Sequence, residues 1–179
     1  MSTEGAIVDF PQVIDGHPGP AASGEWLDSV DPATGMVWAR VPASAATDVD
    51  AAVAAAQGAF PAWWGLPALA RAAHLRRIAE VLSDTTHLLA EIETRDNGRV
   101  IRETLAGDLP ACAQMFHYFA GAADKLHGDT VQVGSTSFNF TRREPYGVVG
   151  VIIPWNAPLS RMSAKVGAAL AAEIGRAHD

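Results

Sequence analysis

The chain has 179 residues, of which 49% are hydrophobic and 18% are charged, and its formal net charge at pH 7 is −7. This balance excludes a largely disordered chain, and the lack of a basic stripe argues against a nucleic-acid partner. The sequence has one cysteine, no signal-peptide pattern and no apolar run as long as a membrane span, so we expect a soluble cytoplasmic protein with no membrane partner.

The first 45 residues are rich in Gly, Pro and Ser and contain short apolar pieces at 12–15 and 37–41. Asp31-Pro-Ala-Thr-Gly35 lies between these pieces and is typical of a turn, because proline presets φ and glycine accepts a positive φ. We therefore expect short strands or extended arms in this region.

From Thr47 the apolar spacing becomes helical. Thr47 is a plausible N-cap with Asp48 in the first turn, where the helix dipole favours acidic residues. Further helices are expected from Pro67, after Ser83 to a C-cap at Gly98, over 99–106, and from Asp108. The residues expected on inward faces are Val49, Ala52, Val53, Ala56 and Phe60 in the first helix, and Leu69, Ala72, Leu75, Ile78, Ala79 and Leu82 in the second, whose Arg71, Arg76 and Arg77 should point outward.

After Lys125 the spacing becomes that of strands. The segments 130–133 and 137–142, joined at Gly134-Ser135, predict a β-hairpin. The run Val148–Ile153 is apolar on both faces, which is typical of a buried strand in a parallel sheet. A helix with Pro158 near its start should follow. The predicted fold is α/β: a helical block, a hairpin and one strand–loop–helix unit.

The loop Pro154-Trp-Asn156 follows that strand, at the sheet edge where α/β proteins bind ligands. An asparagine amide there could donate a hydrogen bond to a developing oxyanion without carrying a titratable proton. A structural alternative is that Asn156 caps the next helix and Trp155 packs beneath it. Spacing alone favours the structural alternative.

The segment Glu144-Pro-Tyr-Gly-Val-Val-Gly-Val-Ile-Ile-Pro-Trp-Asn-Ala-Pro-Leu159, with Lys165 after it, closely resembles the NAD(P)-dependent aldehyde dehydrogenase superfamily. The similarity extends back through Tyr118-Phe-Ala-Gly-Ala-Ala-Asp124, Glu93-Thr-Arg-Asp-Asn-Gly-Arg99, Thr47-Asp-Val-Asp-Ala-Ala-Val53 and Asp31-Pro-Ala-Thr-Gly35, and it covers about residues 10 to 172. The resemblance implies the N-terminal part of a Rossmann-like cofactor domain, with an incomplete sheet and an oligomerisation-type hairpin.

The resemblance also implies roles for individual residues. Asn156 matches the side-chain donor of the oxyanion hole, and Lys165 matches a lysine given a charge-relay role in some members, although a solvated surface lysine is the alternative. The residues that match the strand end beside the NAD or NADP cofactor are Ile152, Ile153, Pro154 and Trp155. Val30, through its carbonyl, and Asp96 match a monovalent-cation site, although Asp96 could instead serve the turn at Asn97-Gly98.

The implied organisation has four parts: an arm and helical block over 1–127, a hairpin over 128–143, a strand–loop–helix unit over 144–172, and a tail outside the family pattern over 173–179. The hairpin matches the element through which family subunits assemble, although a simple edge hairpin would look the same. The family's glycine-rich loop, ribose-gripping segment, nucleophilic cysteine and water-activating glutamate have no counterpart in this sequence.

Cys112 is an unsuitable replacement for the nucleophile, since it lies upstream of Asn156 on an apolar helix face. We therefore expect a portion of a dehydrogenase that oxidises an aldehyde to a carboxylate, cut off before the nucleophile and inactive as this chain alone. The alternative is a non-catalytic interaction module that joins a homo-oligomer or full-length relatives through the hairpin.

Overall fold

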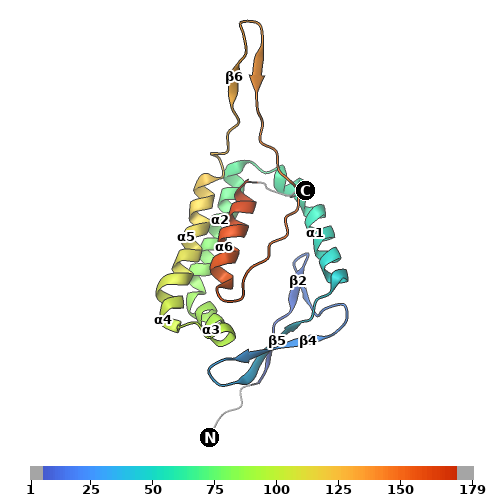
Figure 1. The fold of residues 1–179 in the computed structure, drawn as a ribbon, viewed down its shortest axis with the longest axis vertical. Coiled ribbons are helices and arrows are strands. Elements are labelled where there is room, and N and C mark those ends of the chain that lie inside the picture. Colours follow the sequence, from blue (N-terminus) through green and yellow to red (C-terminus); the bar gives the residue numbers. More distant parts are fainter. Residues whose placement is uncertain (1–5, 173–179) are drawn as a thin grey trace.

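The computed structural model describes residues 6–172. A helical body lies at the centre, two small sheets lie at one end, and a hairpin projects from the other (Figure 1). No helix within 6–172 combines the length and the apolar character needed to cross a bilayer. The predicted tail at 173–179 lies outside the described residues.

The first sheet has the strand order β1-β5-β4. Strand β5 (Met36–Pro42) pairs in parallel with β1 (Val8–Asp9) and antiparallel with β4 (Trp26–Asp31). The predicted turn joins β4 to β5. In it the Asp31 carbonyl accepts a 2.7 Å hydrogen bond from Gly35 N–H, and Gly35 has φ 70°. The second sheet pairs β2 (Gln12–Ile14) with β3 (His17–Gly19).

Helix α1 (Ala46–Trp64) begins one residue before the predicted cap, Thr47, and Ala45 is its N-cap residue. The side chain of Asp48 explains the shift, because its Oδ2 accepts the N–H of Ala45 at 2.9 Å. Its Oδ1 accepts the N–H of Ala22 and the Nε2 of Gln12, each at 2.8 Å. One carboxylate therefore starts the helix and fastens it to the N-terminal arm.

The face of α1 that was expected to be buried is partly open. Val49 is 57% exposed and Val53 is 39% exposed. Among the described elements α1 makes its main contacts with β2 and does not pack along another helix. The apolar spacing therefore gave the right helix, but no described element covers this face.

The core lies where α2 (Ala68–Asp84), α5 (Leu109–Ala122) and α6 (Pro158–Ala172) pack together. Most of its buried side chains are small, which lets the helices approach closely: Ala72, Leu75, Ala79, Leu82, Cys112, Ala113, Phe116, Ala120, Ala123 and Ala171. The prediction for the start of α2 was wrong at two positions. Leu69 is 65% exposed, whereas Arg71 is buried and its guanidinium donates to the carbonyl of Leu66.

Helix α3 (Thr86–Asn97) ends as predicted at Gly98, with φ 76°. A single helical run follows, from α4 (Ile101–Glu103) through the π-turn η1 (Thr104–Asp108) into α5, so Asp108 is helical and does not start a new helix. The wider π-turn explains how Pro110, which lacks an N–H, fits inside a continuous run.

The predicted hairpin is present as β6 (Thr130–Gln132) and β7 (Phe138–Phe140), with Val131 opposite Asn139. Its tip points away from the helical body (Figure 1). All six residues of its strands are exposed. The hairpin therefore forms on its own backbone hydrogen bonds, without cover from the helices.

The predicted strand at Val148–Ile153 is not formed. These residues run as an irregular segment beside α6, and they pair with no strand among residues 6–172 (Figure 1). Ile152 is 89% exposed, so the segment is not buried on both faces. A strand needs a neighbour whose N–H and C=O groups complete the ladder, and the described chain offers none here.

Candidate functional site

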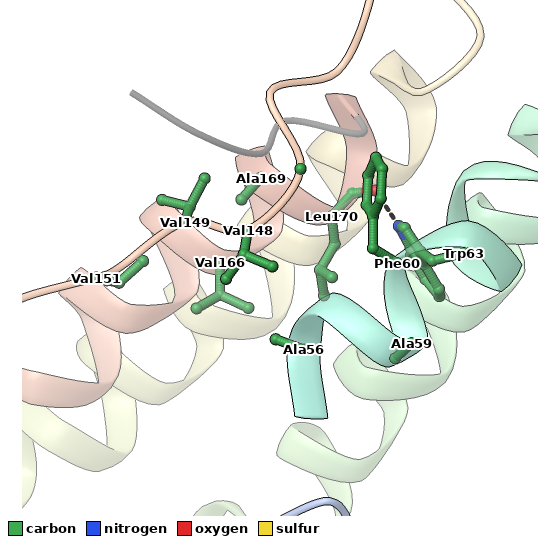
Figure 2. A pocket seen from close by; sticks show the side chains of 11 residues that line it. Ala56, Ala59, Phe60, Trp63, Val148, Val149, Val151, Val166, Ala169 and Leu170 are labelled. Carbon is green, nitrogen blue, oxygen red and sulfur yellow. Dashed lines mark hydrogen bonds between the residues drawn. The ribbon is translucent and has the colours of Figure 1, made fainter. Parts of the chain in front are cut away.

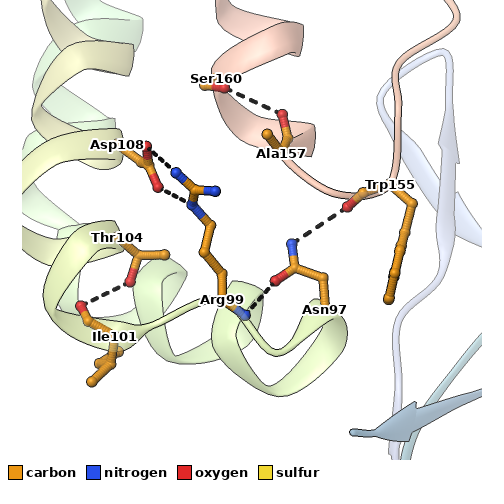
Figure 3. A network of polar contacts seen from close by, with 8 residues as sticks. All are labelled: Asn97, Arg99, Ile101, Thr104, Asp108, Trp155, Ala157 and Ser160. Carbon is orange, nitrogen blue, oxygen red and sulfur yellow. Dashed lines mark hydrogen bonds and ion pairs between the residues drawn. The ribbon is translucent and has the colours of Figure 1, made fainter.

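The candidate site is the turn at Trp155–Asn156, which joins the segment 148–153 to the start of α6. The C-terminal turn of α3 lies opposite this loop (Figure 3). Two contacts join them, one to the backbone of Trp155 and one to its ring. Residues almost 60 positions apart in the sequence thus meet at the loop.

Asn97 makes the backbone contact. Its Nδ2 donates to the carbonyl of Trp155 at 3.4 Å, while its Oδ1 accepts the N–H of Arg99 at 2.9 Å (Figure 3). Gly98 makes this geometry possible because its φ is positive and a Cβ there would lie 2.8 Å from Cγ of Pro32. The helix terminus that the sequence predicted therefore also aims an amide at the candidate loop.

Asp96 makes the contact to the ring. Its Oδ2 accepts Nε1 of Trp155 at 3.1 Å, and its Oδ1 accepts the hydroxyl of Ser29 at 2.6 Å. That hydroxyl in turn accepts Nε1 of Trp38 at 3.0 Å. Two indoles, a hydroxyl and a carboxylate thus link β5, β4, α3 and the candidate loop in one hydrogen-bonded chain.

The two residues matched to a cation site lie on neighbouring elements. Val30 directly follows Ser29 on β4, and Ser29 bonds to Asp96. Both oxygens of the Asp96 carboxylate are used by neutral donors, which is a different arrangement from the turn role considered as an alternative. Within 6–172 no group of three or more His, Cys, Asp or Glu side chains is placed to hold a metal ion.

Asn156 is exposed, and its amide has no hydrogen-bond partner among the described residues. The first turn of α6 is instead closed by Ala157, whose carbonyl accepts the hydroxyl of Ser160 at 3.3 Å and the N–H of Arg161 at 3.2 Å. Trp155 is 63% exposed. Neither structural alternative, a helix cap at Asn156 or a Trp155 packed beneath the helix, is what the structure shows.

Lys165 lies on α6 and is exposed, and its Nζ donates to the carbonyl of Ile152 at 2.6 Å. This bond ties the segment 148–153 to the helix. The next residue, Ile153, is 36% exposed. Lys165 and the predicted cofactor-facing residues are therefore brought together, with apolar surface open beside them.

A group of charged residues at the end of α3 was not predicted as part of the site. Arg99 forms a two-pronged ion pair with Asp108 (Figure 3). Glu93 is 3% exposed, and one of its carboxylate oxygens has no partner among the described residues. Burial, and then the nearby charge of Asp108, raises the pKa of Glu93. Its position three residues after the buried Ala90 was the available sequence signal.

Cys112 lies in the helical core, as expected. It is 1% exposed, and burial raises the pKa of its thiol. A thiol with a raised pKa and no access to solvent is a poor nucleophile. The candidate loop therefore presents a hydrogen-bond donor without a reactive thiol beside it in the described chain.

Comparison with known proteins gives the family. The model of the Aldehyde dehydrogenase family matches residues 20–173. Acetaldehyde dehydrogenase 2 of Cupriavidus necator is 42% identical over 163 residues, which are 91% of this chain and 32% of that protein.

Solved structures agree with this result. An aldehyde dehydrogenase from Bacillus cereus in complex with NAD+ is 36% identical with a TM-score of 0.90, and the match covers 93% of this chain and 34% of that one. PnpE, from Pseudomonas sp. WBC-3, in complex with nicotinamide adenine dinucleotide is 41% identical with a TM-score of 0.88, over 90% of this chain and 33% of that one.

The chain thus spans about a third of the length of these relatives and corresponds to their N-terminal region. Its mixed helices and strands follow part of an aldehyde dehydrogenase structure. On the family match and on these similarities, the chain belongs to the aldehyde dehydrogenase family.

Proposed function

We propose that this chain supplies one part of an NAD(P)-dependent aldehyde dehydrogenase active site, with Asn156 as the oxyanion donor. The observation that carries the proposal is the exposed amide of Asn156, unpartnered within the described chain, on a loop fastened by Asp96 and Asn97. The bonds to Trp155 limit the movement of the loop backbone, and no existing bond of the Asn156 amide has to break when charge develops on a substrate oxygen.

The parent reaction converts an aldehyde, water and NAD(P)+ to a carboxylate and NAD(P)H. The nucleophilic cysteine and the water-activating glutamate that it needs have no counterpart in this sequence, and buried Cys112 does not replace the former. As the thiolate attacks, the aldehyde oxygen gains negative charge, and the Asn156 amide donates to it. Because that amide carries no titratable proton, its contribution does not change with pH.

The residues present fit an NAD or NADP cofactor. Ile152, Ile153 and Trp155 expose an apolar surface suited to a flat aromatic ring, and Lys165 fixes the carbonyl of Ile152. A cofactor held there would supply the acceptor for the hydride that leaves the substrate carbon. Both solved relatives described above hold NAD.

A fused chimera tests the role of Asn156. This chain replaces the matching third of acetaldehyde dehydrogenase 2 from Cupriavidus necator, and aldehyde-dependent formation of NADH is measured. We expect Asn156→Ala to lower kcat by about a hundred- to a thousandfold, as for the loss of one oxyanion donor.

The matched control is Gln114→Ala, which removes an exposed side-chain amide on α5, outside the candidate loop and the hairpin. It should leave kcat within about twofold. Equal rates for the Asn156→Ala chimera and its parent would refute the proposal. The same assay on the unfused chain should give no NADH, and turnover there would disprove its inactivity.

A second candidate function is that of an interaction module. In the hairpin β6–β7, Val133 is 63% exposed, Phe138 is 77% exposed and Phe140 is 63% exposed. Such a projecting apolar surface suits a second copy of this chain or a full-length relative. In this case the chain would assemble without contributing to catalysis.

A further inference from the structure

Two adjacent residues at the C-terminal turn of α3 bind the same residue of the candidate loop. Nδ2 of Asn97 donates to the carbonyl of Trp155 at 3.4 Å, and Oδ2 of Asp96 accepts Nε1 of Trp155 at 3.1 Å. One bond reaches the backbone and the other reaches the ring. Because Trp155 is 63% exposed, burial does little to fix it. These two bonds from α3 therefore set the position of the loop.

The amide of Asn97 has a defined orientation. Its Oδ1 accepts the N–H of Arg99 at 2.9 Å, which directs Nδ2 towards Trp155 (Figure 3). A flipped amide would place Oδ1 against the carbonyl of Trp155, and two acceptors would then face each other. Arg99 is itself held by both carboxylate oxygens of Asp108. The ion pair thus steadies the residue whose N–H orients Asn97.

The bond from Asn97 acts on the peptide unit that leads into Asn156. The carbonyl of Trp155 and the N–H of Asn156 belong to one planar peptide group. A hydrogen bond that restrains this carbonyl therefore restrains the plane from which residue 156 continues. Asn97 is thus placed to limit the directions in which the Asn156 side chain can point.

The other side of the loop gives less support. An apolar cleft of about 350 Å³ lies between α1 and α6, and Val148, Val149 and Val151 line one side of it (Figure 2). Within 6–172, the segment 148–153 receives one hydrogen bond, from Lys165 to the carbonyl of Ile152. Because this segment borders an open cleft and has one bond, the turn of α3 supplies the main restraint on the loop.

We propose that Asn97 is a positioning residue for aldehyde oxidation, which holds the peptide unit 155–156 so that the amide of Asn156 faces the substrate oxygen. Asn97 does not touch the substrate and acts through Asn156, while Asp96 supports it through the ring of Trp155. The proposal rests on the proposed function, and it adds the residue that sets the position of the oxyanion donor.

Two substitutions in the fused chimera remove the donor in different ways. Asn97→Asp keeps an acceptor for the N–H of Arg99 but cannot donate to Trp155. Asn97→Ala loses both bonds and adds no charge. We expect each to lower kcat by about ten- to a hundredfold, because a small displacement of a positioned group is costly. The KM for the aldehyde should stay within about twofold, since the lost interaction acts in the transition state.

A double variant separates positioning from a general structural role. In the Asn156→Ala chimera, adding Asn97→Ala should change kcat by less than about twofold, because the residue through which Asn97 acts is already lost. A purely structural residue would lower kcat in both backgrounds. The matched controls are Gln114→Glu and Gln114→Ala, which make the corresponding changes at an exposed position of α5 and should leave kcat within about twofold.

Backbone ¹⁵N relaxation of the unfused chain gives a measurement that does not depend on activity. The order parameter of the Asn156 N–H should be about 0.85 in the parent and fall below about 0.6 in both Asn97 variants. The Gln114 variants should retain the parent's value.

The proposal is overturned by an unchanged kcat in both Asn97 variants, by additive losses in the double variant, or by an unchanged order parameter at Asn156. Losses of the same size in the Gln114 variants would also overturn it. If Asn156→Ala keeps the parent's rate, the proposed function fails, and the order parameter still decides whether Asn97 positions Asn156.

Discussion

At the scale of single residues, the buried carboxyl of Glu93 leads to a prediction about how the stability of the fold depends on pH. Burial and the charge of Asp108 raise the pKa of Glu93 in the folded chain. The folded state therefore holds this proton at pH values where the unfolded chain has released it. Between the unfolded pKa and the raised folded pKa, stability increases as the pH falls.

Glu93→Gln removes this effect. We expect the variant to be more stable than the parent near neutral pH and to show a smaller gain in stability on acidification. Urea denaturation at about pH 7.5 and about pH 5 measures both effects. Glu91→Gln, at an exposed position of the same helix, should retain the parent's pH dependence. Parallel curves for Glu93→Gln and the parent would contradict the prediction.

The loop Pro154-Trp-Asn156 was predictable from the sequence, but the contacts that support it were not. The motif itself marks the loop, since two prolines and a strand-like run define it locally. The bond from Trp155 to Asp96 joins residues 59 positions apart, and local spacing carries no information about such a contact.

At the scale of elements, alanine substitutions at two glycines in neighbouring helices should have opposite effects on stability. Gly167 of α6 is buried, and a Cβ there would lie 2.8 Å from Cδ2 of Phe119 on α5. Gly121 of α5 is exposed and has nothing within 4 Å of such a Cβ. The first glycine allows two helices to approach, whereas the second only weakens its own helix.

We expect Gly167→Ala to destabilise the chain by about 1–3 kcal/mol, because the added methyl overpacks the contact between α5 and α6. Gly121→Ala should stabilise it by about 0.5–1 kcal/mol through helix propensity. Thermal and urea denaturation of both variants measure the two changes. A gain in stability at Gly167 would show that the ring of Phe119 moves aside at little cost.

Helix ends were predictable where one residue determines them. Gly98 ends α3 through its positive φ, and that requirement is visible in the sequence. The inward face of α2 was predicted correctly at Leu75 and Ala79 but not at its first turn. There the buried Arg71 meets the carbonyl of Leu66 just before the helix, a local contact that apolar periodicity does not describe.

The segment 148–153 shows why a strand is harder to predict from local sequence than a helix. Its composition predicts burial on both faces, yet burial depends on neighbours that the described chain does not contain. A helix satisfies its own backbone, so α1 forms even with an open apolar face, whereas a strand needs a partner.

At the scale of the whole molecule, the exposed hairpin β6–β7 leads to a prediction about self-association. The rings of Phe138 and Phe140 have centroids 5.8 Å apart. The hairpin that carries them projects away from the helical body (Figure 1). If the hairpin joins subunits, Phe138→Ser should weaken self-association by about tenfold or more, as for an aromatic interface anchor. Sedimentation equilibrium of the chain alone measures this.

Leu88→Ser is the matched control, since Leu88 is 58% exposed on α3, at the opposite end of the helical body (Figure 1). It should leave the association constant within about twofold. A strictly monomeric parent chain, or equal effects of the two substitutions, would count against an assembly role for the hairpin.

The uncovered stretch 148–153 also has a consequence for protein synthesis. A ribosome adds about 5–20 residues per second, so an emerging chain would expose this apolar, aggregation-prone stretch for seconds before the residues of α6 followed. Pro145 and Pro154 bracket it, and the ammonium of Lys165 occupies one of its carbonyls. Prolines and charges at such positions act as gatekeepers against aggregation. Residues that shape the candidate site would thereby also protect the nascent chain.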